Sequence, residues 1–175
     1  YNYGSLQPVI NSLKRQFLSF KPVEQKDTVP PHQLLRIIYK GFDIDRGART
    51  TSNSENLSKE IKTGEKKLPD GKVEDIKQTV TAKITYYHKS RGARQMAMFS
   101  ITDASTSGVP QTQEVTGTAL WEMDWATFSG DSRALSSNQQ NLCKKKETNT
   151  TDEEHFRQSM NNLQTDLSNQ LQSFY

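Results

Sequence analysis

The longest regular pattern of apolar and polar residues runs through residues 95–128. In its second half, apolar or small side chains occupy the odd positions from Val115 to Trp125, and polar ones occupy the even positions, with Leu120 as the exception. A period of two places the odd side chains on one face of a β-strand. Residues 96–102 form a shorter apolar segment, and the intervening residues 103–111 are rich in turn-forming Ser, Gly and Pro. The pattern predicts a long antiparallel hairpin.

Two more segments have the pattern of strands. Residues 75–88 alternate, and one face carries the apolar or aromatic side chains Ile76, Val80, Ala82, Ile84 and Tyr86. We expect residues 89–92 to make a tight turn into the 96–102 strand, which gives three consecutive strands of an antiparallel meander. Residues 34–44 are β-branched and aromatic enough for a fourth strand, followed by a turn at residues 45–47.

An amphipathic helix is predicted near each end of the chain. In the N-terminal one, apolar side chains recur at spacings of three and four: Leu6, Val9, Ile10, Leu13, Phe17 and Phe20. In the C-terminal one, the same spacing extends over about 23 residues. Its apolar residues are Phe156, Met160, Leu163, Leu167, Leu171 and Phe174. Thr151 and Glu154 match a capping box, and residues 133–146 predict a short helix. The expected fold class is α+β: a small, mostly antiparallel four-stranded sheet packed on one face by the N-terminal and the long C-terminal helix.

The composition limits the number of domains, the size of the core and the classes of function. With 175 residues and 32% hydrophobic side chains, residues 1–175 are expected to form a single domain with one thin core. Residues 49–71 are polar and Lys-rich, almost without large apolar side chains, and are expected to be a mobile, solvated loop. The net charge of +3 is far from the dense positive charge of a dedicated nucleic-acid binder. No apolar run is long enough to cross a bilayer.

Motifs for catalysis or metal binding are not found in the sequence. None of His32, His88 and His155 has a Cys or a second His at the spacing of metal ligands. Cys143 has no evident partner base, and as the one cysteine it cannot form an intramolecular disulfide. We therefore expect no enzymatic activity, no metal and no cofactor.

Three sets of side chains are candidates for binding. Trp121 and Trp125 share a strand face, and they either pack in the core or present flat rings to a ligand. Residues 86–94 combine aromatic rings with positive charge around the predicted turn, so Lys89 and Arg91 either contact phosphates or lie at a merely soluble hairpin tip. The same two interpretations apply to two lysine patches: Lys66, Lys67 and Lys72, and residues 144–146.

Several short motifs occur in a fixed order along the chain. Asn2-Tyr3-Gly4-Ser5-Leu6 opens the first helix, Leu35-Arg36-Ile37 begins the first strand, and Ile101-Thr102-Asp103-Ala104 enters a turn. Residues 131–140 and 159–171 complete the series. This order resembles that of the LptE family of lipopolysaccharide-assembly lipoproteins, with its PYGPL helix start, LRI-like strand, LTDA-type turn, ALA-containing segment and closing helix of the EM-x-x-DLA-x-QLL type.

The resemblance implies an outer-membrane lipoprotein of Gram-negative bacteria that lies on the periplasmic side. A lipid anchor would be attached to a cysteine upstream of Tyr1. The partner would be the β-barrel LptD, whose lumen such proteins plug, and the protein would bind lipopolysaccharide and assist its assembly at the cell surface. On this interpretation the basic side chains contact lipid A phosphates, and no nucleic acid is bound. These side chains are Lys66, Lys67, Lys72, Lys89 and Arg91.

Two alternatives stay open. A periplasmic auxiliary lipoprotein of another envelope transport machine could combine the same small sheet with two helices, and fold alone does not separate the two families. A nucleic-acid-binding module would use residues 86–94 as its contact face. Steeply salt-dependent binding to generic oligonucleotides would favour that module.

Overall fold

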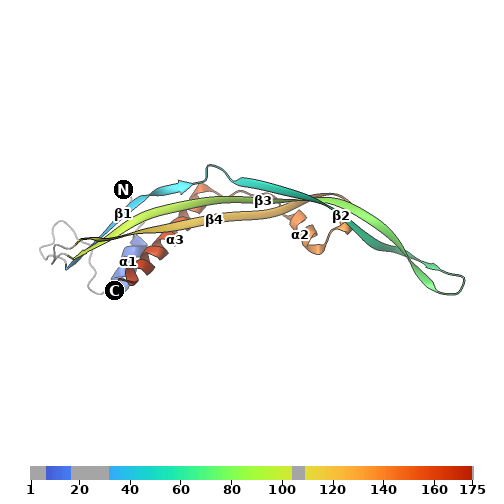
Figure 1. Ribbon diagram of the computed structural model, residues 1–175, viewed down its shortest axis with the longest axis horizontal. Coiled ribbons are helices and arrows are strands. Elements are labelled where there is room, and N and C mark those ends of the chain that lie inside the picture. The colour runs from blue at the N-terminus through green and yellow to red at the C-terminus, as the bar shows by residue number, and fades with distance from the viewer. Residues whose placement is uncertain (1–6, 17–31, 104–108, 175) are drawn as a thin grey trace. The chain divides into compact units, whose positions relative to one another are not determined.

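The computed structural model describes residues 7–16, 32–103 and 109–174. Its helices and strands follow one another along the chain as shown in Figure 1: α1 (Gln7–Gln16), β1 (Gln33–Ile44), β2 (Arg49–Lys67), β3 (Val73–Asp103), β4 (Gln111–Gly130), the 3-10 helix η2 (Ser132–Ala134), α2 (Ser137–Lys144) and α3 (Asp152–Gln172). The four strands form one antiparallel sheet, and the α+β class expected from the sequence is confirmed.

Strand β3 is the central element of the sheet. β1 pairs with its C-terminal part, from Gln33 opposite Asp103 to Ile44 opposite Ala93. β2 pairs with its N-terminal part, from Arg49 opposite Ser90 onwards. β4 pairs with the other edge of β3 and completes the predicted hairpin. β1 and β2 run in the same direction, both antiparallel to β3. The predicted turn at residues 45–47 is therefore wrong, and these residues only interrupt the pairing with β3.

The predicted tight turn at residues 89–92 is also wrong, and with it the meander. These residues lie in the middle of the 31 residues of β3. Contacts from residues far away in the sequence hold them extended. The Gly92 N–H donates to Oδ2 of Asp45 at 2.7 Å, and the Asp45 N–H donates to the Gly92 carbonyl at 3.0 Å. A glycine beside charged residues predicts a turn from the local sequence. Gly92 is instead a strand residue that Asp45 approaches closely.

The prediction of a mobile loop over residues 49–71 is wrong for residues 49–67, which form β2. Leu57 and Ile61, four residues apart, share a face and pack against a buried cluster. The other side chains are polar because β2 is an outer strand. Lysines and the irregular pairing between Lys62 and Gly64 are features that protect such an edge from joining other strands.

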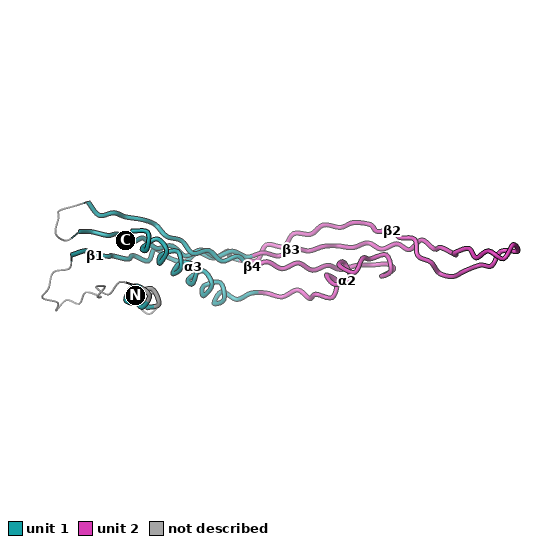
Figure 2. Tube along the Cα trace, turned by 90° about the horizontal axis from the view of Figure 1, so that it is seen from below, with its two compact units in different colours: residues 1–46, 91–121, 150–175 teal, residues 47–90, 122–149 magenta. Residues whose placement is uncertain are grey.

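The chain forms two compact units, which Figure 2 distinguishes by colour: residues 1–46, 91–121 and 150–175 make unit 1, and residues 47–90 and 122–149 make unit 2. Each unit has its own buried apolar cluster, so the expectation of a single core is wrong. β3 and β4 contribute residues to both units.

In unit 1, α1 and α3 pack on one face of the sheet, as predicted (Figure 1). The core combines one residue of α1, the apolar stripe of α3 and odd-numbered strand positions: Leu13, Ala97, Phe99, Val115, Met160, Leu163, Leu167 and Leu171. Gly117 faces α3 at very short range. A Cβ built on it would lie 2.0 Å from the Ser159 carbonyl oxygen and 2.2 Å from the Leu163 nitrogen.

In unit 2, η2 and α2 pack against even-numbered strand positions. The buried cluster contains Val80, Ala82, Ile84, Ala126, Ala134 and Leu135. Along β3 the alternation of buried positions therefore changes phase, from even residues up to Ile84 to odd residues from Lys89 onwards. When a strand pattern of period two changes phase in this way, each half predicts a separate strand. The residues between the two halves are then interpreted as a turn.

The helix ends follow the predicted signals in part. Thr151 caps α3 by accepting from the Glu154 N–H, and α2 begins with a full capping box of Ser136 and Gln139. The predicted cap Ser5 and the apolar positions Leu6, Phe17 and Phe20 lie outside the described residues. Within the described residues, none of the helices has the length and apolarity needed to cross a membrane.

Candidate functional site

Lys89 lies inside unit 2 and is not a surface cation. Its side chain is 10% exposed, and its ammonium group contacts Oε1 of Glu147 at 2.5 Å and Oδ1 of Asn149 at 2.5 Å. The segment that follows α2 is thereby fixed over β3. A buried ammonium group needs such partners, since leaving it unpaired would be very costly.

Arg91 is held by internal partners within unit 1, as Lys89 is within unit 2. Its guanidinium contacts Oδ1 of Asp152 at 2.7 Å and donates through Nε to the Asp45 carbonyl at 3.1 Å. It therefore links the first turn of α3 to the end of β1. These partners are 46 and 61 positions away in the sequence (45 to 91, and 91 to 152), and no local signal could have identified them.

The lysines Lys66, Lys67 and Lys72 lie together at the turn between β2 and β3. Lys66 is opposite Glu74, and Lys67 is opposite Val73. Lys72 is 3.4 Å from Oδ2 of Asp70 and is 80% exposed. Neither Lys66 nor Lys67 makes an ion pair with another described residue. Exposed pairs such as Lys72 with Asp70 are worth about 0–1 kcal/mol, so these lysines can change partners at little cost.

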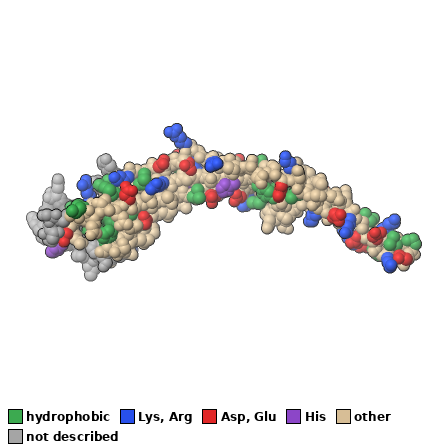
Figure 3. Space-filling model, in the orientation of Figure 1, with side chains coloured by type: hydrophobic (Ala, Val, Ile, Leu, Met, Phe, Trp, Pro, Cys, Tyr) green, Lys and Arg blue, Asp and Glu red, His purple; other side chains and the backbone are tan. Residues whose placement is uncertain are grey.

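We call residues 58–81 the arm: the last part of β2, the turn and the first part of β3. Positive and negative side chains are interspersed along it (Figure 3). Lys62 contacts Asp75 at 2.6 Å and Glu65 at 2.5 Å, and Lys77 is 3.7 Å from Glu60. The hydrogen bonds that Lys62 donates to Asp75 and Glu65 raise its pKa. The arm therefore carries mixed charge along its whole length, including the turn, where Lys66 is opposite Glu74 and Lys72 is paired with Asp70.

The aromatic candidates are packed internally. Trp125 is buried and stacks on Tyr87, with ring centroids 5.0 Å apart and planes 11° apart. For Trp125 this favours core packing over a ligand platform; Trp121 is half-buried. Tyr86 donates to Glu55 at 2.6 Å and accepts from Gln139 at 2.8 Å, and the hydrogen bond to Glu55 raises its pKa.

The residues considered for chemistry are separated from one another. Nδ1 of His88 is 2.8 Å from Oδ1 of Asp124, with Glu122 nearby at 3.7 Å. His155 is buried, and neither ring nitrogen has a hydrogen-bond partner among the described residues. Burial raises the pKa of the Cys143 thiol. Over residues 7–16, 32–103 and 109–174, no three His, Cys, Asp or Glu side chains converge as metal ligands would.

Asp131 gives a pH prediction. Its carboxylate accepts hydrogen bonds from the side chain and the N–H of Arg133, which lower its pKa from 3.8 to about 2. A lowered folded-state pKa adds stability that is complete above the unfolded value and disappears as the pH falls towards the folded value. We expect the urea midpoint of the wild type to exceed that of Asp131→Asn at neutral pH, with the difference shrinking between about pH 4 and pH 2. A difference that stayed constant over this range would contradict the assignment.

An open groove lies where β4 ends in unit 2. It encloses about 490 Å³ and is lined by Asn56, Leu57, Ser58, Thr81, Ala82, Lys83, Ser129 and Gly130. Its lining mixes polar and apolar groups and contains a single cation, Lys83. Nothing in the sequence pattern indicated this groove, because it depends on where β4 stops relative to β3.

Comparison of the chain with protein-family models, with curated proteins and with solved structures gave no match.

Proposed function

We propose that this protein is a non-catalytic binding component of the Gram-negative outer membrane, of the LptE kind. It would be lipid-anchored on the periplasmic side, plug the lumen of an LptD β-barrel and bind lipopolysaccharide during its assembly at the cell surface. The observation that supports the proposal is the arrangement in unit 1. Helices near the two ends of the chain, α1 and α3, lie on one face of an antiparallel sheet, in the order of elements that the motifs resemble.

The other face of the sheet in unit 1 mixes polar side chains with the exposed apolar side chains of Leu34 and Leu120. Along β4, the positions that alternate with the core are Glu114, Thr116 and Thr118. Barrel interiors are polar, so a protein lodged there meets hydrated side chains and not lipid tails. The two threonines of β4 can exchange hydrogen bonds with such a wall.

Among the five basic residues predicted to contact lipid A phosphates, the turn lysines fit best. Lys66, Lys67 and Lys72 are exposed and lie at one turn, and phosphate oxygens are strong acceptors for ammonium donors. Lys89 and Arg91 would first have to leave Glu147 and Asp152. We therefore restrict the proposed contact to the three turn lysines. The same two internal pairs engage two of the cations in the contact face, residues 86–94, predicted for the nucleic-acid alternative.

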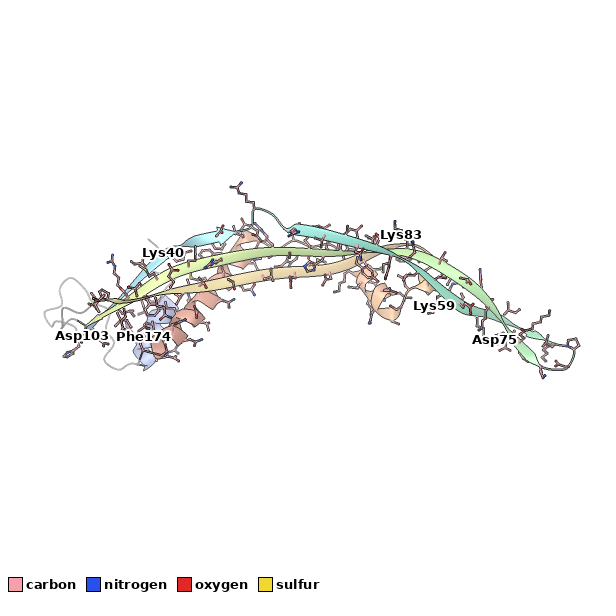
Figure 4. All side chains as sticks on the ribbon, in the orientation of Figure 1. Lys40, Lys59, Asp75, Lys83, Asp103 and Phe174 are labelled. Atoms are coloured by element: carbon pink, nitrogen blue, oxygen red, sulfur yellow. The ribbon has the colours of Figure 1, made fainter. Side chains whose placement is uncertain are left out.

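Charge reversal at the turn lysines tests this contact. The triple variant Lys66→Glu, Lys67→Glu, Lys72→Glu is expected to bind purified lipopolysaccharide at least about tenfold more weakly, the equivalent of about 1.4 kcal/mol. The control reverses three other exposed lysines, Lys40, Lys59 and Lys83 (Figure 4), with the same change in net charge. Unchanged binding by the first variant would refute the lysine assignment. If the wild type bound no lipopolysaccharide, the LptE-type function itself would be refuted.

A further inference from the structure

Part of β3 has an edge that no described strand occupies. β4 ends at Gly130, whose φ of +104° turns the chain away, and the Asp131 N–H makes the last bond to β3, to the Thr81 carbonyl at 3.0 Å. Beyond this point β3 continues to Val73, paired on one side with β2. Residues 73–80 therefore have one paired and one open edge.

The direction of the backbone groups on the open edge follows from the pairing. In an antiparallel ladder, the N–H and C=O of one residue point to the same edge, and successive residues alternate. The Thr81 carbonyl points towards β4, so Val73, Asp75, Lys77 and Thr79 direct their backbone groups to the open edge. The Thr63 hydroxyl of β2 donates to the Ile76 carbonyl at 3.2 Å, as expected for an even residue that points the other way.

The arm has too few covered side chains to be a stable ribbon alone. Two-stranded ribbons are marginally stable in water without a third strand or a covering layer. Ile76 is 48% exposed and Val73 is 52% exposed, and they lie on opposite faces of the ribbon. Ile61 packs against the core of unit 2, but the apolar face continues past it to Ile76. A further strand at the open edge would complete the arm.

We propose that the open edge of β3 pairs, antiparallel, with the same edge of a second copy of this chain, with Ile76 on the twofold axis. In this register Asp75 lies opposite Lys77 of the second copy, and Lys77 lies opposite its Asp75. Two symmetry-related ion pairs thus flank an isoleucine pair. A twofold interface requires such a self-complementary surface, because each patch meets its own copy.

The backbone geometry fits this register. Asp75 and Lys77 both direct their N–H and C=O groups outward, so they form the hydrogen-bonded pairs. Ile76 then occupies a non-hydrogen-bonded pair, in which Cα atoms lie about 4.5 Å apart and side chains come closest. The largest apolar side chain of the edge is therefore placed where cross-strand packing is strongest.

The charges of Asp75 and Lys77 favour this register over the two adjacent symmetric registers. A shift of one residue along each strand in one direction places Asp75 opposite Asp75 of the second copy. A shift in the other direction places Lys77 opposite Lys77. Like charges directly opposite each other are destabilising, so both alternatives are disfavoured.

Existing contacts extend the proposed ion pairs into a chain of alternating charge. Lys77 already contacts Glu60, and Asp75 contacts Lys62, with all four side chains on one face of the ribbon. Pairing would connect Glu60 and Lys77 of one copy to Asp75 and Lys62 of the other.

Cysteine crosslinking tests the twofold position. In a Cys143→Ser background, Ile76→Cys is expected to give a disulfide-linked dimer under mild oxidation, because position 76 meets itself. Gln78→Cys is the control on the same face; its two copies would lie about 14 Å apart, four residues along the strand. Equal crosslinking of both variants, or no crosslinking of Ile76→Cys, would overturn the register.

Complementary charge variants test the ion pairs in solution. Asp75→Lys and Lys77→Asp, each alone, place like charges opposite each other twice per dimer, and each is expected to raise the dimer dissociation constant at least about tenfold. An equimolar mixture restores two opposite-charge pairs in a heterodimer, so dimers should reappear in sedimentation experiments. A monomeric wild type, or a mixture no more dimeric than its components, would overturn the proposal. Lipopolysaccharide binding is a separate measurement, so failure here leaves the proposed function standing.

Discussion

Replacing Gly117 by alanine is expected to lower the free energy of unfolding of unit 1 by about 4 kcal/mol or more, beyond the usual range for overpacking. The added Cβ would lie 2.0 Å from the Ser159 carbonyl oxygen, 2.2 Å from the Leu163 nitrogen and 2.7 Å from its Cα. All three are backbone atoms of α3, so no side-chain rotation relieves the overlap. The helix would have to lift from the sheet and expose its leucines.

The measurement is urea denaturation, combined with hydrogen exchange of the α3 amides. Gly47→Ala is the matched control, because a Cβ there meets nothing within 4 Å and Gly47 has no positive φ. It should change the stability by less than about 0.5 kcal/mol. Native-like stability of Gly117→Ala would mean that α3 does not lie against β4 at this distance.

Replacing Phe99 by alanine is expected to cost about 3–5 kcal/mol. Phe99 has no exposed surface and is the largest fully buried side chain of the protein's described residues. Its ring meets Phe174 edge-on, with centroids 5.6 Å apart and planes at 82°. The loss combines the transfer of the ring, the cavity that remains and this aromatic contact.

Two further variants separate the effect of burial from the effect of the type of side chain. Phe128→Ala removes the same side chain from a strand position that is 42% exposed, and should cost about 1 kcal/mol or less. Phe99→Leu keeps most of the volume and should cost less than about 1.5 kcal/mol. Similar losses for Phe99→Ala and Phe128→Ala in urea denaturation would contradict the position of Phe99 in the core.

The sequence predicted the elements that bury one face against a single neighbouring surface. The 111–130 strand, the C-terminal helix and the Thr151 cap were all visible, because each has one buried face and a local signal. The 49–67 strand was missed because an outer strand with Lys-rich, polar faces has the composition of a loop. Its only apolar signal is Leu57 and Ile61.

The continuity of β3 was missed for a different reason. Its buried positions change from even to odd between Ile84 and Lys89, and two cations and Gly92 follow at residues 89–92. Each cation is stabilised by a carboxylate from a distant part of the chain, Glu147 or Asp152. Such long-range pairs leave no trace in local periodicity. For the same reason, Lys89 and Arg91 were placed at a basic turn that does not exist.

The central proposal, a binding component that plugs a barrel, is tested most directly by co-expression with a candidate LptD β-barrel. The chain would carry the affinity tag and be purified in detergent without crosslinking. A stoichiometric complex that survives purification is the predicted result, since a plug is enclosed by its barrel. Recovery of the chain alone, with the barrel present and folded in the same membranes, would contradict the LptE-type function.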